Sequence, residues 1–140
     1  MTKYESDIKI IFSSEEVVFR LLSDLSNLEK FKNEPNAPQQ LQEAEFDKDS
    51  CRFKVEGLGV VGVRIVERES NSTIKFEAEN IPMVKVKAWI HLEQIAENET
   101  QMSLKMEADI PLMMKMMLDK KIKTGINQVA DVIAKAVNNR

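Results

Sequence analysis

The sequence predicts an α+β protein in which a curved antiparallel sheet of about six to seven strands wraps around one long C-terminal helix. Residues 41–109 read as a succession of strands separated by short turns, and strands joined by short turns pair antiparallel. Residues 112–138 follow as a single apolar helical pattern. One face of each strand is charged, so only the other face is buried, and the terminal helix is the element available to cover it.

The N-terminal part is predicted to be one strand followed by two short helices. Residues 4–12 place apolar or small side chains at every second position, which is typical of a half-buried strand. Ser14 can cap a helix because its hydroxyl accepts from free backbone amides, and Glu16 lies near the positive end of the helix dipole. A second short helical turn is expected from Ser26 or Asn27. Residues 32–38 then form a loop, since their prolines and asparagines oppose both helix and strand.

The strands that follow are expected at residues 42–47, 51–55, 60–69, 74–79, 84–96 and 102–109. The glycines at 57, 59 and 62 are suitable places for the sheet to bend. The buried stripe of the terminal helix is predicted to be Leu118, Ile122, Ile126, Val129 and Ile133. Gly125 lies beside this stripe and would let the sheet, or a ligand, approach the helix closely.

Composition limits the classes of protein that this chain can belong to. A length of 140 residues with 43% hydrophobic residues fits one domain with a substantial core. The net charge of −3 argues against general nucleic-acid binding, which needs a basic surface. The single cysteine excludes an internal disulfide, and the N-terminus lacks the apolar core of a secretory signal. No stretch is long and apolar enough to span a bilayer, so we expect a cytoplasmic protein.

The order of these elements resembles the helix-grip pattern of the START-like, or SRPBCC, superfamily, which includes birch-pollen allergen proteins, polyketide cyclases and lipid-transfer domains. The resemblance rests on the strand at 4–12 running directly into residues 14–19, the turn at 26–28, the glycine-punctuated segment 55–59 and the terminal helix. It covers nearly the whole chain and implies a single START-like domain over residues 1–140. It also implies an apolar ligand held between the concave sheet and the long helix. Some members are enzymes, some carry lipid or quinone and some bind protein partners, and no family catalytic motif is visible here.

The predicted ligand site lies between the inward faces of the strands and the terminal helix. Its lining residues are expected to be Ile8, Ile10, Phe53, Val55, Phe76, Val86, Ile90, Leu104, Met106, Met113, Met117 and Ile122. Inward polar side chains that would orient the ligand are Tyr4, Ser6 and Gln42. The methionines at 113, 114, 116 and 117 cannot all face the core, because a helix turns about 100° per residue. Plain core packing explains part of this cluster, and the mouth of a pocket or a partner surface is the alternative.

Three single residues each have an ordinary interpretation beside a functional one. His91 is the only histidine and alternates with apolar neighbours, which places it on the charged outer face rather than in a site for acid–base chemistry or metal binding. Trp89 shares that face, where it packs over lysine stems or forms an interaction patch. Cys51 alternates with Phe53 and reads as a small buried hydrophobe, with a reactive thiol as the alternative.

Two groups of charged residues are expected to be solvated. The carboxylates at 43, 45 and 47 form a row that would be costly to bury without partners. The lysines at 120, 121 and 123 form a small basic spot on the terminal helix, for which contact with a membrane or a phosphate is the functional alternative. The sequence has neither a phosphate-binding loop nor a nucleophile elbow.

Three functions compete on this reading. The first is binding or carriage of a small hydrophobic molecule such as a lipid, a quinone or a polyketide-like ring, without any cofactor or metal. The second is a protein-interaction module or homodimer without a ligand. The third is a cyclase- or dehydratase-type enzyme, which needs an acid or base inside the pocket, and the inward faces offer chiefly Tyr4.

Overall fold

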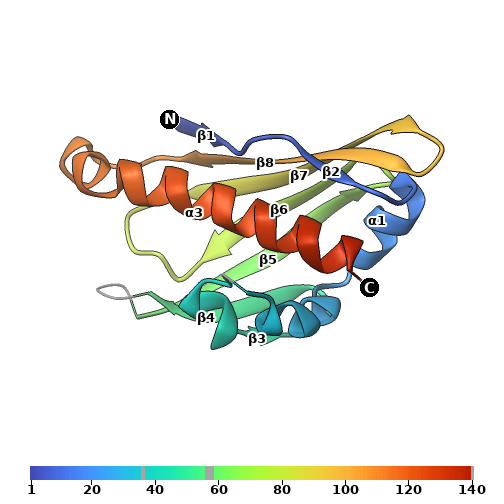
Figure 1. Cartoon of the computed structure of the whole chain (residues 1–140). Coiled ribbons are helices and arrows are strands. Elements are labelled where there is room, and N and C mark those ends of the chain that lie inside the picture. The colour runs from blue at the N-terminus through green and yellow to red at the C-terminus, as the bar shows by residue number, and fades with distance from the viewer. Residues whose placement is uncertain (36, 56–58, 140) are drawn as a thin grey trace.

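The computed structural model describes residues 1–35, 37–55 and 59–139, and one antiparallel sheet curls around a long helix (Figure 1). The strands are β1 (Thr2–Glu5), β2 (Lys9–Ile11), β3 (Glu45–Phe46), β4 (Ser50–Val55), β5 (Gly59–Glu69), β6 (Thr73–Glu79), β7 (Val86–Ala96) and β8 (Glu99–Ala108). The helices are α1 (Glu15–Leu22), the 3₁₀ helix η1 (Leu25–Asn33), α2 (Gln39–Gln42) and α3 (Leu112–Asn138). The strand order is β1-β8-β7-β6-β5-β4-β3, and β2 also pairs with β8. The predicted α+β fold is confirmed.

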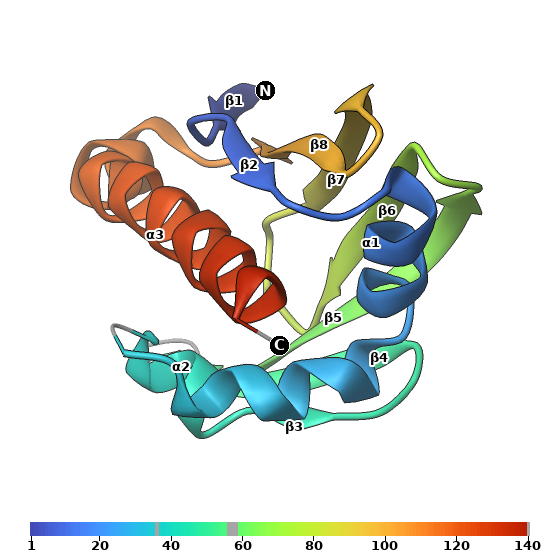
Figure 2. The same ribbon diagram turned by 45° about the vertical axis from the view of Figure 1, so that its right-hand side comes forward.

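The sheet is strongly curved, so that its two ends rise on either side of α3 (Figure 2). Register shifts between Ile65 and Glu67 in β5, and between Gln94 and Ala96 in β7, interrupt the regular pairing. Such irregularities bend a strand and increase its twist. Gly59 begins β5 with a φ of +84°, a backbone conformation that side-chain-bearing residues rarely adopt. The expected bend at Gly57 lies outside the described residues, as do residues 56 and 58 of the segment behind the family resemblance.

The predicted single strand over residues 4–12 is wrong in one respect, because it is broken at Ser6. The Ser6 amide donates to the Leu104 carbonyl at 2.9 Å, and the Ser6 hydroxyl accepts from the Leu104 amide, also at 2.9 Å. After this break the register against β8 moves by one residue, from Tyr4 opposite Met106 to Ile10 opposite Gln101. A shift of one residue turns every following side chain to the other face of a sheet. Ile11 is therefore the buried residue of β2, at 0% exposure.

The predicted strand over residues 42–47 is shortened to two residues, and its first residue belongs to a helix instead. Gln39–Gln42 forms α2, and only Glu45–Phe46 pairs with β4. The side-chain Nε2 of Gln42 donates to the Ala37 carbonyl at 2.9 Å, which ties α2 to the loop before it. Glutamines favour a helical turn over a strand, so local propensity explains the difference. The carboxylates at 43, 45 and 47 are exposed, as expected.

The other helices begin close to the predicted positions. Ser14 caps α1, because its hydroxyl accepts from the Val17 amide at 3.3 Å. Asp24 rather than Ser26 caps η1, since its carboxylate accepts from the Ser26 amide at 3.0 Å. η1 continues to Asn33, further than the sequence indicated. No helix in the described ranges is both long and apolar enough to cross a bilayer.

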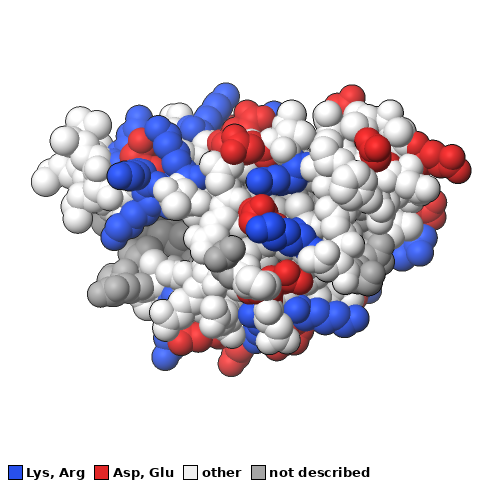
Figure 3. All heavy atoms as spheres, viewed as in Figure 1, with Lys and Arg blue, Asp and Glu red and all other residues white. Residues whose placement is uncertain are grey.

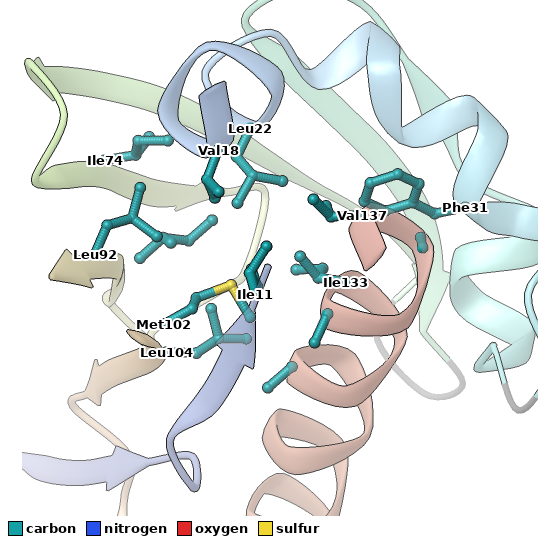
Figure 4. Close-up of a cluster of buried hydrophobic side chains, with 14 of the residues drawn as sticks. Ile11, Val18, Leu22, Phe31, Ile74, Leu92, Met102, Leu104, Ile133 and Val137 are labelled. Carbon is teal, nitrogen blue, oxygen red and sulfur yellow. The ribbon is translucent and has the colours of Figure 1, made fainter. Parts of the chain in front are cut away.

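The core is packed tightly at only one end of α3. The fully or nearly buried residues of this helix all lie in its second half, and they are Ala130, Val132, Ile133, Ala134, Ala136 and Val137. Ile11, Val18, Leu22 and Met102 meet them from the sheet and from α1 (Figure 4). The first half of α3 contributes no buried residue, and Leu112 is 73% exposed. Helix and sheet therefore form a solid core at the C-terminal end of α3 and separate towards its N-terminal end.

Candidate functional site

The space between the sheet and the first two thirds of α3 is hollow. An inner chamber of about 410 Å³ begins at the packed core, and an outer chamber of about 440 Å³ continues towards the start of α3. The two adjoin, since both are walled by Val63, Phe76, Ala88, Met106 and Ile122. We refer to them together as the cavity.

The inner chamber is walled by residues from every layer of the fold. The leucines at 22, 25 and 28 come from α1 and η1 and cover it from one side. The sheet adds Cys51, Ile90 and Leu104, with Lys105 at the edge, and α3 adds Gly125, Ile126, Val129 and Ile133. Because almost all of these side chains are hydrocarbon, water inside the chamber would find few hydrogen-bond partners.

The outer chamber is walled by strand residues, by the loops around them and by α3. Its members beyond the shared wall are Gln40, Phe53, Val55, Val61, Ala78, Ile81, Val84, Val86, Ala108, Ile110, Met114, Leu118 and Lys121. Gln40 and Lys121 are the polar side chains of this wall, and both are exposed residues. They therefore mark the rim, where the apolar interior meets solvent.

Gly125 lies on the wall of the inner chamber and faces open space. A Cβ atom built on Gly125 would meet no atom within 4 Å outside its own helix neighbourhood. The expectation that this glycine lets the sheet approach α3 is therefore wrong, and the residue instead leaves open volume in the inner chamber. A glycine inside a helix costs about 0.5–1 kcal/mol relative to alanine. No packing contact offsets that cost here.

Most of the residues expected to line a ligand site lie on the walls of the cavity. Phe76, Met106 and Ile122 line both chambers. Ile90 and Leu104 line the inner chamber, and Phe53, Val55 and Val86 line the outer one. These positions follow from simple alternation along long, well-paired strands and from the helical stripe of α3.

Four of the expected lining residues lie elsewhere. Ile8 is 59% exposed in the turn between β1 and β2, and Ile10 is on the outer face because of the register shift after Ser6. Met113 and Met117 are 81% and 76% exposed. Their places are taken by Met114 and Leu118. The signal for Met114 was present in the sequence, since it lies four residues before Leu118 on the predicted stripe.

None of the three expected polar orienting groups lines either chamber. The Tyr4 hydroxyl donates to Asp119 Oδ1 at 2.9 Å, and burial raises the pKa of Tyr4, with a further contribution from Asp119. Hydrogen bonds from Lys123 and from Tyr4 hold the pKa of Asp119 below its ordinary value. Ser6 bonds to Leu104, and Gln42 is exposed and bonded to Ala37.

Polar contacts fasten α3 along one of its flanks. Besides the Tyr4–Asp119 bond, Lys9 Nζ lies 3.5 Å from Asp131 Oδ1. The Asn138 side chain accepts from the Phe12 amide at 2.8 Å and donates to the Ile10 carbonyl at 3.1 Å. These contacts run along β1 and β2, so the cavity wall on this side is held in place by directed bonds.

Cys51 lines the inner chamber, in agreement with its expected alternation with Phe53, although it was not among the expected lining residues. Burial raises the pKa of its thiol to about 11, with opposing effects from Arg52 and Asp47. The thiolate is the reactive form of cysteine, so this environment favours the apolar, unreactive role.

We predict that Cys51 of the folded protein reacts slowly with iodoacetamide at pH 8. A rise of the pKa from 9.0 to about 11 lowers the thiolate fraction, and hence the rate, by roughly 100-fold relative to the unfolded chain. Mass spectrometry of alkylation with time, in buffer and in urea, measures this ratio. Equal rates in the two conditions would show that the thiol does not lie in an apolar wall.

The outer face of the sheet carries the lone histidine. His91 lies opposite Thr73 and Ser103, and its Nδ1 is 3.4 Å from the Thr73 hydroxyl oxygen. Burial, and then Lys105, lower the pKa of His91. Lys75 Nζ lies 5.9 Å from the ring centre of Trp89. The tryptophan therefore packs against a lysine side chain, which was one of the two expectations for this residue.

Across residues 1–35, 37–55 and 59–139, no group of three or more His, Cys, Asp or Glu could hold a metal ion.

Solved structures with the same architecture extend over nearly the whole chain. A START superfamily protein from Mycobacterium smegmatis superimposes with a TM-score of 0.61 and 14% identity, over 99% of this chain and 95% of its own. Norcoclaurine synthase from Thalictrum flavum gives a TM-score of 0.72 with 14% identity, over 99% and 87%. This chain has the helix-grip fold of the START-like superfamily.

The superfamily resemblance expected from the sequence is thereby confirmed at the level of the fold. The Aha1 dimer from Colwellia psychrerythraea has the same START-like fold, with a TM-score of 0.64 and 14% identity over 100% of both chains. No family model and no curated protein matches the sequence. These identities are too low to carry a substrate or a partner to this chain, so function has to be argued from its own cavity.

Proposed function

We propose that this START-like protein binds one small hydrophobic molecule in the cavity and acts as a carrier or sensor of it. The observation that carries the proposal is the pair of adjoining chambers with hydrocarbon walls, of about 410 and 440 Å³. Ligand sites of proteins are typically about 300–1,000 Å³ and mostly apolar. Burial of ligand surface at about 25 cal/mol per Å² supplies the affinity.

The shape of the cavity favours an elongated molecule with one polar end. Its walls run along α3 from Met114 to Ile133, which is about 28 Å at 1.5 Å per residue. The inner end is apolar, and Gln40 and Lys121 lie at the rim of the outer chamber. A fatty acyl chain or prenyl quinone, inserted tail first with its polar end beside Lys121, fits this distribution of groups.

The walls favour binding over catalysis. Apart from the methionine thioethers, the side chains of the described walls that carry a heteroatom are Cys51 and Lys105 in the inner chamber and Gln40 and Lys121 in the outer one. Neither chamber presents a carboxylate or a histidine among these residues, and the pKa of Cys51 is raised rather than poised near neutrality. General acid–base catalysis needs a group whose pKa lies near the working pH.

Titration with cis-parinaric acid, after removal of bound lipid, tests the proposal. We expect saturable binding of one molecule per chain, competed by dodecanoic acid and by a short-chain quinone. Native mass spectrometry of the protein as purified provides an independent readout. Absence of any bound molecule together with absence of saturable binding to both ligand types would overturn the carrier proposal.

The position of Lys121 predicts a preference for an anionic end group. Lys121→Gln is expected to weaken dodecanoate binding about 3- to 10-fold and leave dodecanol binding unchanged, because only the carboxylate interacts with the charge. Lys120→Gln is the matched control, since this neighbouring lysine is exposed and does not line the outer chamber. Equal effects of the two substitutions on dodecanoate would show that Lys121 does not contact the end group.

A further inference from the structure

Large apolar side chains are exposed at the end of the molecule where α3 begins. Leu112, Met113, Met116 and Met117 are 73%, 81%, 78% and 76% exposed, and Met83 in the loop between β6 and β7 is 94% exposed. The loop lies beside the start of α3, because the Asp109 amide donates to the Lys85 carbonyl at 2.9 Å. We call these five side chains the methionine tip. Their exposure is costly in water, and a patch of this kind marks a surface that meets an apolar partner.

Met83 combines high exposure with an unusual backbone conformation. Its φ is +62°, in the left-handed region that residues with a side chain rarely adopt. The neighbouring Ile81 and Val84 face the outer chamber instead. The loop therefore divides its apolar side chains between the cavity and the exterior.

The charges beside the methionine tip are mainly positive, although the whole chain carries −3. Lys115, Lys120, Lys121 and Lys123 lie on α3 within about three turns of its start. The acidic residue in this part of the helix is Asp119, which is itself paired with Lys123. Figure 3 shows this end as an uncharged surface bordered by a cluster of lysine and arginine side chains. Lys85 lies in the adjoining loop, with Asp109 as its acidic neighbour.

We propose that the methionine tip docks on the surface of a bilayer that contains anionic lipid. Exposed methionines would enter the interface between headgroups and acyl chains, while the lysines contact the negative headgroups. The arrangement favours lipid over a protein partner. Flexible methionine side chains bordered by long lysine side chains can adapt to a surface that has no fixed shape, such as a bilayer. Docking leaves the protein on the surface, since none of the described helices is suited to cross a bilayer.

The outer chamber opens beside the docked surface. Ile81, Val84, Ile110, Met114 and Leu118 line it, and each lies within four residues of a member of the methionine tip. A lipid leaving the bilayer would thus meet the mouth of the cavity directly. The docking proposal depends only on the methionine tip and the lysines beside it. The transfer of a lipid into the cavity depends in addition on the proposed function.

Flotation of the full chain with vesicles tests the docking, using phosphatidylcholine alone and phosphatidylcholine with 30% phosphatidylglycerol. We expect binding to the anionic vesicles that falls at least tenfold between 50 and 500 mM salt, because surface charge is screened. The triple variant Met113→Ser, Met116→Ser, Met117→Ser is expected to lose at least tenfold in binding. The double variant Lys115→Gln, Lys120→Gln is expected to lose severalfold on anionic vesicles only.

Control variants make the same kinds of substitution at exposed residues outside the methionine tip. Phe12→Ser and Ile95→Ser remove apolar side chains that are 64% and 46% exposed, and Lys48→Gln removes an exposed lysine. These variants are expected to bind vesicles as the natural chain does. Gly125→Phe, which obstructs the inner chamber, should also bind vesicles normally, so that failure of ligand binding and failure of docking are distinguished.

Three results would overturn the docking proposal. The first is no binding to either vesicle, and the second is binding that the methionine substitutions leave unchanged. The third is self-association in sedimentation that the triple methionine variant abolishes, with no vesicle binding, which would assign the tip to a second copy of the chain.

Discussion

Gly125→Phe is expected to weaken ligand binding strongly without unfolding the protein. The aromatic ring enters the inner chamber, where a Cβ at this position meets nothing within 4 Å. A ligand that loses about 100 Å² of apolar contact at about 25 cal/mol per Å² loses about 2.5 kcal/mol, or roughly 70-fold in affinity. Titration with cis-parinaric acid measures the affinity, and urea unfolding measures the stability.

Gly125→Ala is the matched control for this substitution. A methyl group is too small to fill the chamber, so ligand affinity should change little. Replacing a helical glycine with alanine should raise the free energy of unfolding by about 0.5–1 kcal/mol. Normal ligand binding by Gly125→Phe would place the ligand outside the inner chamber, and destabilisation by Gly125→Ala would show that α3 and the sheet are closely packed there.

Two methionines on β8 should differ widely in their contribution to stability. Met102 is 0% exposed and belongs to the packed core, whereas Met106 lines both chambers. Met102→Ala is expected to cost about 2–5 kcal/mol because it leaves a new void in a solid core. Met106→Ala is expected to cost about 1 kcal/mol or less. Much of the Met106 side chain already faces empty space, so the substitution removes few van der Waals contacts.

Urea unfolding of both variants, without ligand, measures this difference. The two substitutions remove the same atoms from the same strand, so strand propensity cancels in the comparison. Losses of equal size would mean that the space around Met106 is filled, and the cavity proposal would fail with it. Met106→Ala should in addition weaken ligand binding, because it removes part of the wall shared by the two chambers.

The lining of the cavity was predictable wherever secondary structure is long and regular. Ile90 and Leu104 face each other across β7 and β8, and period-two alternation is enough to find such pairs. Prediction failed where a local feature changed which residues of a strand face inward. At Ser6 the side-chain hydroxyl, rather than a backbone carbonyl, accepts from β8, and the shifted register that follows turns Ile10 outward. It also failed where residues distant in sequence meet, as Leu25 and Leu28 of η1 meet Cys51 in the inner chamber.

The sequence by itself determined the order of the long strands and of the first and last helices, the antiparallel pairing and the apolar stripe of α3, because these depend on periodicity and on turn chemistry that act over a few residues. Only the tertiary structure decided that α3 packs solidly at one end and stands away from the sheet at the other. Whether apolar residues fill a space or merely surround it depends on how far apart curved strands hold their faces. The position of α3 relative to the sheet also leaves Met113 and Met117 in solvent, while Met114 lines the cavity.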